Sequence, residues 1–317
     1  MSSGGLRPLR VGEILDAAIK LYVRSARVLM GAAATVTVPL QLLTAIVLLS
    51  VYNSGQDIPT GFSGLGSTVP QADAAARAGA SAIVAVIALI ATALVTAACV
   101  KAISDAYLDQ PASIEGTLRF ALRRLAPLLG MEVLLALGLG IGFVLLVIPG
   151  IWLYARWGVA TPALVIERRN PFRALGRSSR LVKGRWWPTA GVLLLANLMV
   201  FLVSGVIDGL LTAAASLSSH HSLLFAVVIS TAAATVSGIL VQPFNAAVTT
   251  VLYYDLRIRR EGYDVELMAE QLGIPEASLP PAAPGEAGFA GPLGPDMVGK
   301  PGGPPYWPPP PGWQPGQ

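Results

Sequence analysis

The sequence predicts an all-α polytopic membrane protein with about six hydrophobic helices, amphipathic helices before the first, third and fifth of them, and a disordered C-terminal tail. Of the 317 residues, 13% are charged and 54% are hydrophobic, whereas a soluble domain carries about a quarter charged residues. Several stretches also reach the ~20 mostly apolar residues that a helix needs to cross a bilayer. We therefore expect a helical membrane domain over residues 1–270 and a tail over residues 271–317.

Five stretches qualify as membrane spans by length and hydropathy: residues 28–51, 78–100, 126–148, 188–211 and 223–252. The contested stretch is 150–166, GIWLYARWGVATPALVI, because it is short, directly follows Pro149 and carries Arg156. Hydropathy alone therefore leaves the choice between five and six spans open.

The charge of the connecting segments favours six spans, because Lys and Arg collect on the cytoplasmic side of membrane helices. Five of the 22 basic residues precede the first span, and further groups of four, seven and three lie at 101–124, 168–185 and 257–260. The loops 52–77 and 212–222 hold one and none. If the contested stretch spans, all four basic segments share one side, so both termini are expected in the cytoplasm of a cell-membrane protein.

Each odd-numbered span follows a proline-led stretch with helical apolar spacing: PLRVGEILDAAIKLY from Pro8, PASIEGTLRFALRRL from Pro111 and PFRALGRSSRLVKGR from Pro171. Helices with one apolar and one basic face lie in the membrane interface and attract anionic lipid. On one interpretation, the chain consists of three repeats, each with one amphipathic helix and two spans. On the other, the three stretches are ordinary basic connectors between spans. Both interpretations predict the same topology. The candidate lipid-headgroup contacts are Arg173, Arg177 and Arg180.

Two ionisable residues at membrane depth form a candidate polar pair. Glu132 lies six residues into the third span, and Arg156 lies ten residues from the inner end of the fourth. An antiparallel hairpin would bring them close, and charges at this depth often mark function. The alternatives are a structural pair that fixes helix register, or an Arg156 that reaches toward an interface near Trp152 and Trp157.

The sequence contains no residue pattern typical of an enzyme active site. The two histidines, His220 and His221, are adjacent in an expected outer loop without acidic or cysteine neighbours at ligand spacing, and Cys99 is the single cysteine. No phosphate-loop, dinucleotide, zinc-protease or serine-hydrolase motif occurs. We expect no catalytic residues, no cofactor and no metal. Nucleic-acid binding is not expected either, because the basic residues are explained by membrane orientation.

The C-terminal segment, residues 271–317, contains 14 prolines and 10 glycines and ends in PPYWPPPPGWQPGQ. Such a composition favours extended, disordered chain. The proline runs could dock on an aromatic groove of a cytoplasmic partner, or the segment could simply be a solubilising tail.

Three separated motifs, RPLRVGEILDAAIKLY, PGIWLYARWGVATPALVIE with the following PFRALGRSSRLVKGRWW, and YYDLRIRREGYDVEL, together resemble the glycerophosphoryl diester phosphodiesterase membrane-domain family of bacterial, often actinobacterial, membrane proteins. In that family the helical region can be fused to a soluble barrel that hydrolyses glycerophosphodiesters, but many members are the membrane part alone. This chain is similar to the second kind, because no cytoplasmic stretch could hold a barrel of ~250 residues.

No catalytic residue carries over from the resemblance; the membrane motif does. Its residues here are Pro149, Gly150, Trp152, Glu167, Ala174, Leu175, Ser178, Leu181, Val182, Gly184 and Trp186. The favoured hypothesis is a non-enzymatic membrane protein that scaffolds a partner or binds anionic lipid. The alternative is a transporter or permease-like component that uses the region of Glu132 and Arg156, where polar and bent helices meet. The oligomeric state, any solute and any tail partner are not specified by the sequence.

Overall fold

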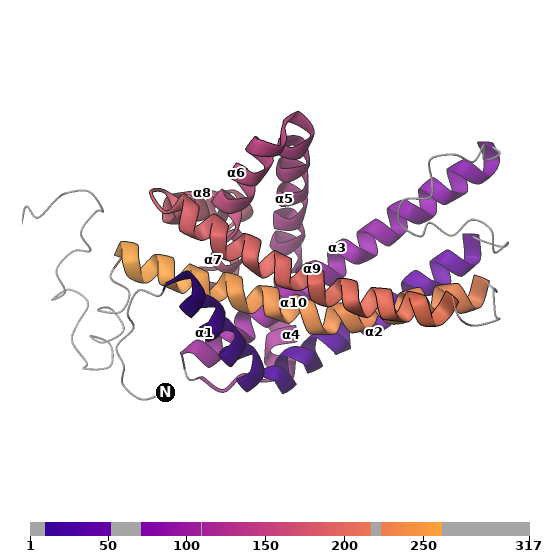
Figure 1. Cartoon of the computed structure of the whole chain (residues 1–317), viewed down its shortest axis with the longest axis horizontal. Coiled ribbons are helices and arrows are strands. Elements are labelled where there is room, and N and C mark those ends of the chain that lie inside the picture. The colour runs from indigo at the N-terminus through magenta and orange to yellow at the C-terminus, as the bar shows by residue number, and fades with distance from the viewer. Residues whose placement is uncertain (1–9, 52–70, 109, 217–222, 262–317) are drawn as a thin grey trace, which may run out of the picture. The chain divides into compact units, whose positions relative to one another are not determined.

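The computed structural model describes residues 10–51, 71–108, 110–216 and 223–261 (Figure 1). Within these ranges the chain forms α-helices and no β-strand, so the all-helical prediction is confirmed for the described part. The chain divides into two compact units, Met1–Arg259 and Arg260–Gln317, and the features below belong to the first. The predicted tail, 271–317, lies outside the described residues.

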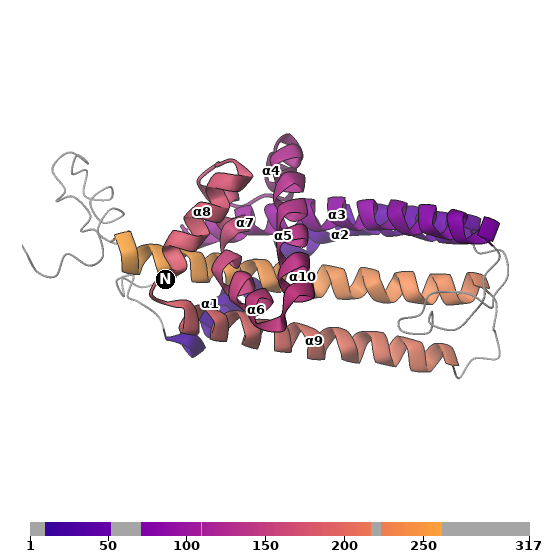
Figure 2. The same cartoon turned by 90° about the horizontal axis from the view of Figure 1, so that it is seen from above.

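Five described helices are long and apolar enough to cross a membrane: α2 (Ala26–Val51), α3 (Gln71–Tyr107), α5 (Leu125–Leu145), α9 (Trp186–Ser216) and α10 (Leu223–Glu261). They coincide with the five stretches that hydropathy selects without argument. The pair α9 and α10 runs side by side in both cartoon views (Figure 1 and Figure 2).

The predicted fourth span is not one continuous helix. It is divided into α6 (Val147–Trp157) and α7 (Ala160–Ile166). The division follows from Pro162, which has no N–H to donate to the carbonyl of Gly158 four residues earlier. At 1.5 Å per residue, neither piece reaches the ~30 Å of the hydrocarbon core.

Short helices form at all three proline-led stretches: α1 (Val11–Arg24), α4 (Ile114–Arg123) and α8 (Pro171–Val182). Each directly precedes a long helix, namely α2, α5 or α9. Their apolar faces pack partly against the bundle, as buried Ile14 and Leu21 show in α1 and Leu181 in α8. These faces are therefore only partly available to lipid.

The C-terminal part of helix α10 lies inside the bundle. Its residues 250–256 are all buried, and a helix buried on every side is one surrounded by protein. Tyr22 of α1 donates to the Leu240 carbonyl (3.2 Å), and the hydroxyls of Ser104 and Tyr254 lie 2.7 Å apart. These hydrogen bonds fasten α10 to α1 and α3, two helices from the N-terminal third of the chain.

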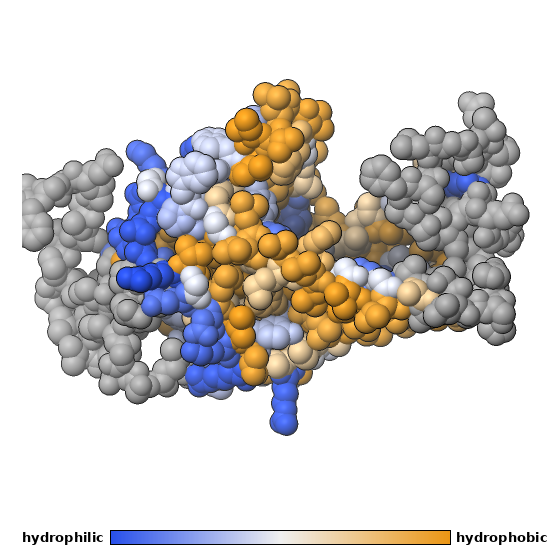
Figure 3. All heavy atoms as spheres, in the orientation of Figure 1, coloured by the Kyte–Doolittle hydropathy of each residue, from blue (hydrophilic) through white to orange (hydrophobic). Residues whose placement is uncertain are grey.

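Helices α5 and α6 form a hairpin that runs crosswise to α9 and α10 (Figure 1 and Figure 2). The two helices approach closely where a Cβ added to Gly142 would lie 3.2 Å from the Cα of Gly150. At the tip, Val144 and Ile148 are 88% and 79% exposed. Figure 3 shows hydrophobic side chains covering this tip, whereas hydrophilic ones gather over α1 and α8. The tip is thus apolar surface without protein cover.

Candidate functional site

A polar cavity of about 360 Å³ lies among α3, α5, α6, α7, α9 and α10, and we call it the central cavity. Its polar lining residues are Thr92, Thr96, Glu132, Tyr154, Trp157, Thr161, Gln242, Asn245 and Thr249. Leucine side chains and Pro162 complete the wall. An apolar wall with a few convergent polar groups is the usual make-up of a small-molecule site.

Glu132 is the one carboxyl group in the lining of the central cavity, and no basic side chain lines it. The side chain is half-buried on α5. Within the described ranges its carboxyl oxygens make no hydrogen bond and no ion pair. A carboxyl group in a largely apolar helix bundle is costly unless a proton, a cation or water compensates it.

Most of the other polar groups in the lining are uncommitted as well. The side chains of Thr161, Gln242 and Asn245 make no hydrogen bond to the described residues. The Tyr154 hydroxyl, by contrast, accepts a hydrogen bond from the Asn197 amide. These side chains are half-buried, so their polar groups are available to water or a solute in the cavity.

The break between α6 and α7 contributes directly to the cavity. Trp157 and Gly158, on either side of the helix end, and Thr161 with Pro162, at the start of α7, all line it. Broken helices at membrane depth are tolerated where the irregular backbone lines a cavity. A Cβ added to Gly138 of α5 would overlap the Trp157 ring, so this glycine makes room for the indole.

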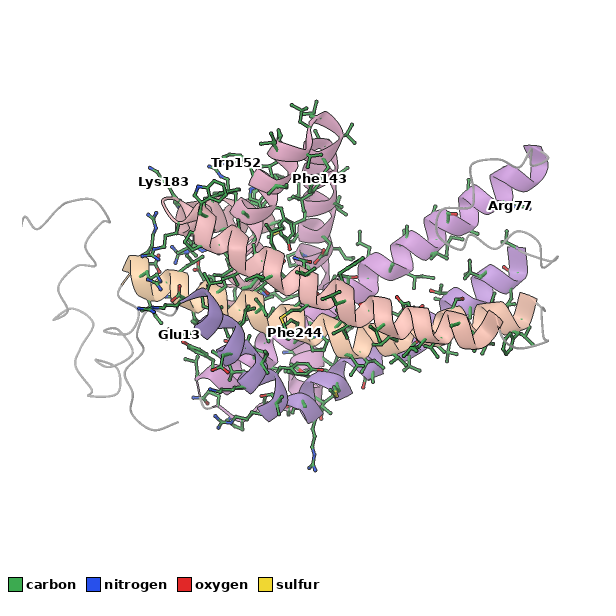
Figure 4. The ribbon with its side chains drawn as sticks, in the orientation of Figure 1. Glu13, Arg77, Phe143, Trp152, Lys183 and Phe244 are labelled. Atoms are coloured by element: carbon green, nitrogen blue, oxygen red, sulfur yellow. The ribbon has the colours of Figure 1, made fainter. Side chains whose placement is uncertain are left out.

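The structure does not bring the predicted pair together. The guanidinium of Arg156 lies over the Trp152 ring, 4.6 Å from its centroid, whereas Glu132 faces the central cavity. Figure 4 shows Trp152 on α6 at the same end of the molecule as Lys183. Arg156 thus follows the alternative in which it contacts an aromatic neighbour, and Glu132 alone belongs to the cavity.

A second cluster surrounds Glu167, the residue directly after the end of α7. Its Oε1 accepts hydrogen bonds from Tyr253 (2.6 Å) and from Nε of Arg177 (2.7 Å), and its Oε2 accepts one from Arg169. Burial alone would raise the pKa of Glu167, but these hydrogen bonds and the charges of Arg177 and Arg169 lower it below its usual value. The cluster ties α7, α8 and α10 into one unit. From the sequence alone, only Arg169 could be expected near Glu167, because it lies two residues away.

The motif residues beside Glu167 make structural contacts. The Ser178 hydroxyl donates to the Arg156 carbonyl (2.8 Å), and the Trp186 indole donates to the Trp152 carbonyl (3.3 Å). Gly184 has φ 78°, which favours glycine. The remaining motif residues lie in the first turn of α6 or on α8, where all but Pro149 and Leu175 are fully buried: Pro149, Gly150, Ala174, Leu175, Leu181 and Val182.

The candidate lipid contacts on α8 separate into two kinds. Arg173 and Arg180 are exposed, but the Arg177 side chain is only 13% exposed and is paired with Glu167. Exposed Phe172 and Trp187 flank the surface arginines in sequence. Two of the three arginines are therefore available to headgroups, and the third holds the Glu167 cluster.

A family model described as a domain of unknown function (DUF8558) matches residues 116–274, just over half of the chain. The chain belongs to this family. No curated protein matches it, and no solved structure does. The DUF8558 segment begins within α4 and includes Glu132, Glu167 and every lining residue of the central cavity except Thr92 and Thr96.

Proposed function

We propose that this protein is a non-enzymatic, transporter-like component of the cytoplasmic membrane that binds a small cationic solute, or exchanges a proton, at Glu132. The observation that carries the proposal is the central cavity, in which one carboxyl group stands among uncommitted hydroxyl and amide groups. A charged side chain at membrane depth costs ~3 kcal/mol on insertion scales. A role in binding would explain why a residue as costly as Glu132 is present there.

The chemistry of the lining selects the solute. A carboxylate without a basic partner attracts a positive charge, and the oxygens of Thr161, Gln242 and Asn245 can complete its hydrogen bonds. The volume of about 360 Å³ is at the small end of ligand sites. A monovalent organic cation of a few heavy atoms, or hydronium with its water, fits these properties better than a lipid or a peptide.

The topology that we favour has four crossing helices, α2, α3, α9 and α10, whereas the α5–α6 hairpin lies across them, roughly in the plane of the membrane, and does not span it. Two observations support it: α5 runs crosswise to α9 and α10, and the hairpin tip is apolar and exposed. The charges require only that both ends of this hairpin share the inner side. Both termini then face the cytoplasm, as they also do with six crossings.

A second candidate function is a scaffold that binds anionic lipid and a partner of the tail. It rests on exposed Arg173 and Arg180 beside exposed Phe172 and Trp187, a pairing typical of membrane interfaces. The resemblance to the glycerophosphoryl diester phosphodiesterase membrane-domain family supports a role as a membrane module. Neutralising both arginines should weaken binding to phosphatidylglycerol liposomes; unchanged binding would remove this candidate.

The cavity proposal is tested with the purified full chain in detergent and two probes, guanidinium and tetramethylammonium chloride, at matched ionic strength. Binding of a probe should raise the thermal midpoint of the wild type by mass action. Glu132→Gln should abolish that rise, and the control Glu115→Gln, an exposed carboxyl on α4, should keep it. Equal responses of Glu132→Gln and the wild type, or no response to either probe, would refute cation binding at Glu132.

A further inference from the structure

A second cavity, of about 310 Å³, lies between the N-terminal ends of α1 and α9 and the C-terminal part of α10. We call it the arginine cavity, because Arg10, Arg185 and Arg259 all line it. These arginines precede α1, precede α9 and lie near the end of α10. The lining shares no residue with that of the central cavity.

The charges in the arginine cavity are unbalanced. Asp255 is the only acidic group in the lining, and it accepts a hydrogen bond from Nε of Arg259 at 2.8 Å. In the part of the chain that the structure describes, the guanidinium groups of Arg10 and Arg185 make no ion pair and no hydrogen bond. Arg10 and Arg185 are exposed and carry like charges, so an anion between them would be attracted to both guanidinium groups.

An independent observation points to the same ligand. Thr189 lines the cavity and is 1% exposed. Its hydroxyl is the one buried side-chain polar atom among the described residues that has no hydrogen-bond partner. The backbone N–H of Thr189 is already committed, because it donates to the Arg185 carbonyl at 3.2 Å. A buried hydroxyl without a partner is destabilising, so an acceptor brought into the cavity would remove that cost.

We propose that the arginine cavity binds a phosphate group. The planar guanidinium groups of Arg10 and Arg185 would each donate to phosphate oxygens, and the Thr189 hydroxyl would donate to a third. The apolar part of the lining, with Ile14 and Leu252 among its members, could contact the first part of the acyl chains of an anionic phospholipid. The phosphate could equally come from a soluble ester, and the chemistry of recognition is the same.

The test uses the full chain in a non-ionic detergent and two probes, dioctanoyl phosphatidylglycerol and inorganic phosphate, with binding measured by titration calorimetry and thermal midpoint. The wild type should bind at least one probe, and Arg10→Gln/Arg185→Gln should lower its affinity at least tenfold. Phosphatidylglycerol alone identifies a lipid headgroup, whereas inorganic phosphate identifies a soluble ester. Binding of neither probe would overturn the proposal.

Two further variants separate a built site from general attraction to positive charge. Arg119→Gln/Arg123→Gln removes the same charge from an exposed face of α4 and should leave the affinity within twofold of the wild type. Thr189→Val should fold, because it only removes an unpartnered hydroxyl, and should lower the affinity about fivefold to tenfold. An equal loss in the α4 control, or wild-type affinity in Thr189→Val, would overturn the proposal.

Discussion

Replacing Glu167 by glutamine tests whether the cluster at the end of α7 holds three helices together. The carboxylate is 12% exposed and receives hydrogen bonds from Arg177, Tyr253 and Arg169. Glutamine has almost the same shape and keeps one oxygen as an acceptor, but it loses the charge. Arg177, itself only 13% exposed, then stays in place and loses the negative charge of Glu167.

The size of the effect follows from that burial. Removing one partner of a buried ion pair costs about 3–5 kcal/mol, because the other charge is left uncompensated. The retained oxygen recovers part of this, so we expect a loss of about 2–3 kcal/mol, in the range of hydrogen bonds to charged groups. For a chain of this size, that lowers the thermal midpoint by on the order of 5–10 °C.

The assay is thermal unfolding of the detergent-solubilised protein, followed by intrinsic fluorescence and by loss of the monodisperse peak on size exclusion. Glu115→Gln is the matched control, because the Glu115–Arg119 pair is exposed, and such pairs contribute under ~1 kcal/mol. A cycle with Arg177→Met should show coupling between residues 167 and 177. If Glu167→Gln loses no more than Glu115→Gln, the structural reading of the cluster is refuted.

The pH dependence has a definite sign. Burial raises the pKa of Glu167 in the folded state, but its hydrogen bonds and the charges of the two arginines lower the pKa by more than burial raises it. The unfolded chain therefore binds the proton more tightly, and the stability that Glu167 contributes is present above the ordinary carboxyl range. That contribution should disappear as the pH falls through the lowered pKa. Glu167→Gln should lack this part of the acid destabilisation.

Two further predictions concern the α5–α6 hairpin. Gly142→Ala should lower the thermal midpoint, because its Cβ would lie 3.2 Å from the Cα of Gly150. Gly140→Ala, whose Cβ would have nothing within 4 Å, should raise the midpoint, because alanine is about 1 kcal/mol more favourable than glycine in a helix. The reverse order would contradict the packing of the two helices. Leu146→Cys should resist a membrane-impermeant maleimide on intact cells, whereas a cysteine in the 52–77 loop should react. Labelling at 146 would show that the tip reaches the outer surface and that α5 and α6 both cross.

The sequence predicted the long helices well, because each is an uninterrupted apolar run of membrane length, and hydropathy measures that property directly. It did not predict the division of the fourth stretch, although Gly158 and Pro162 were the local signals. A window average treats GVATP as apolar residues, whereas the backbone responds to the missing N–H of Pro162. Hydropathy reports side-chain hydrophobicity and not backbone hydrogen bonding, so it does not detect this helix break.

The candidate site was predicted in part. Depth along two antiparallel helices places Glu132 and Arg156 near the same level, but contact also requires the right rotation of each helix. Adjacent helical residues point about 100° apart, so Trp157 faces the central cavity while Arg156 lies against Trp152. That rotation is set by packing between distant segments, which a single sequence does not contain. The same holds for the contact of Glu167 with Tyr253, 86 positions apart.

Helix α10 connects the three features that matter for function. Gln242 and Asn245 line the central cavity, Asp255 and Arg259 line the arginine cavity, and Tyr253 between them bonds to Glu167. The part of α10 after Pro243 is continuous helix and still reaches both cavities, so a shift or rotation of it would change both together. The Tyr253–Glu167 hydrogen bond opposes such a movement. A phosphate in the arginine cavity and a cation at Glu132 are therefore expected to influence each other's affinity through α10, and by linkage the influence must be equal in both directions.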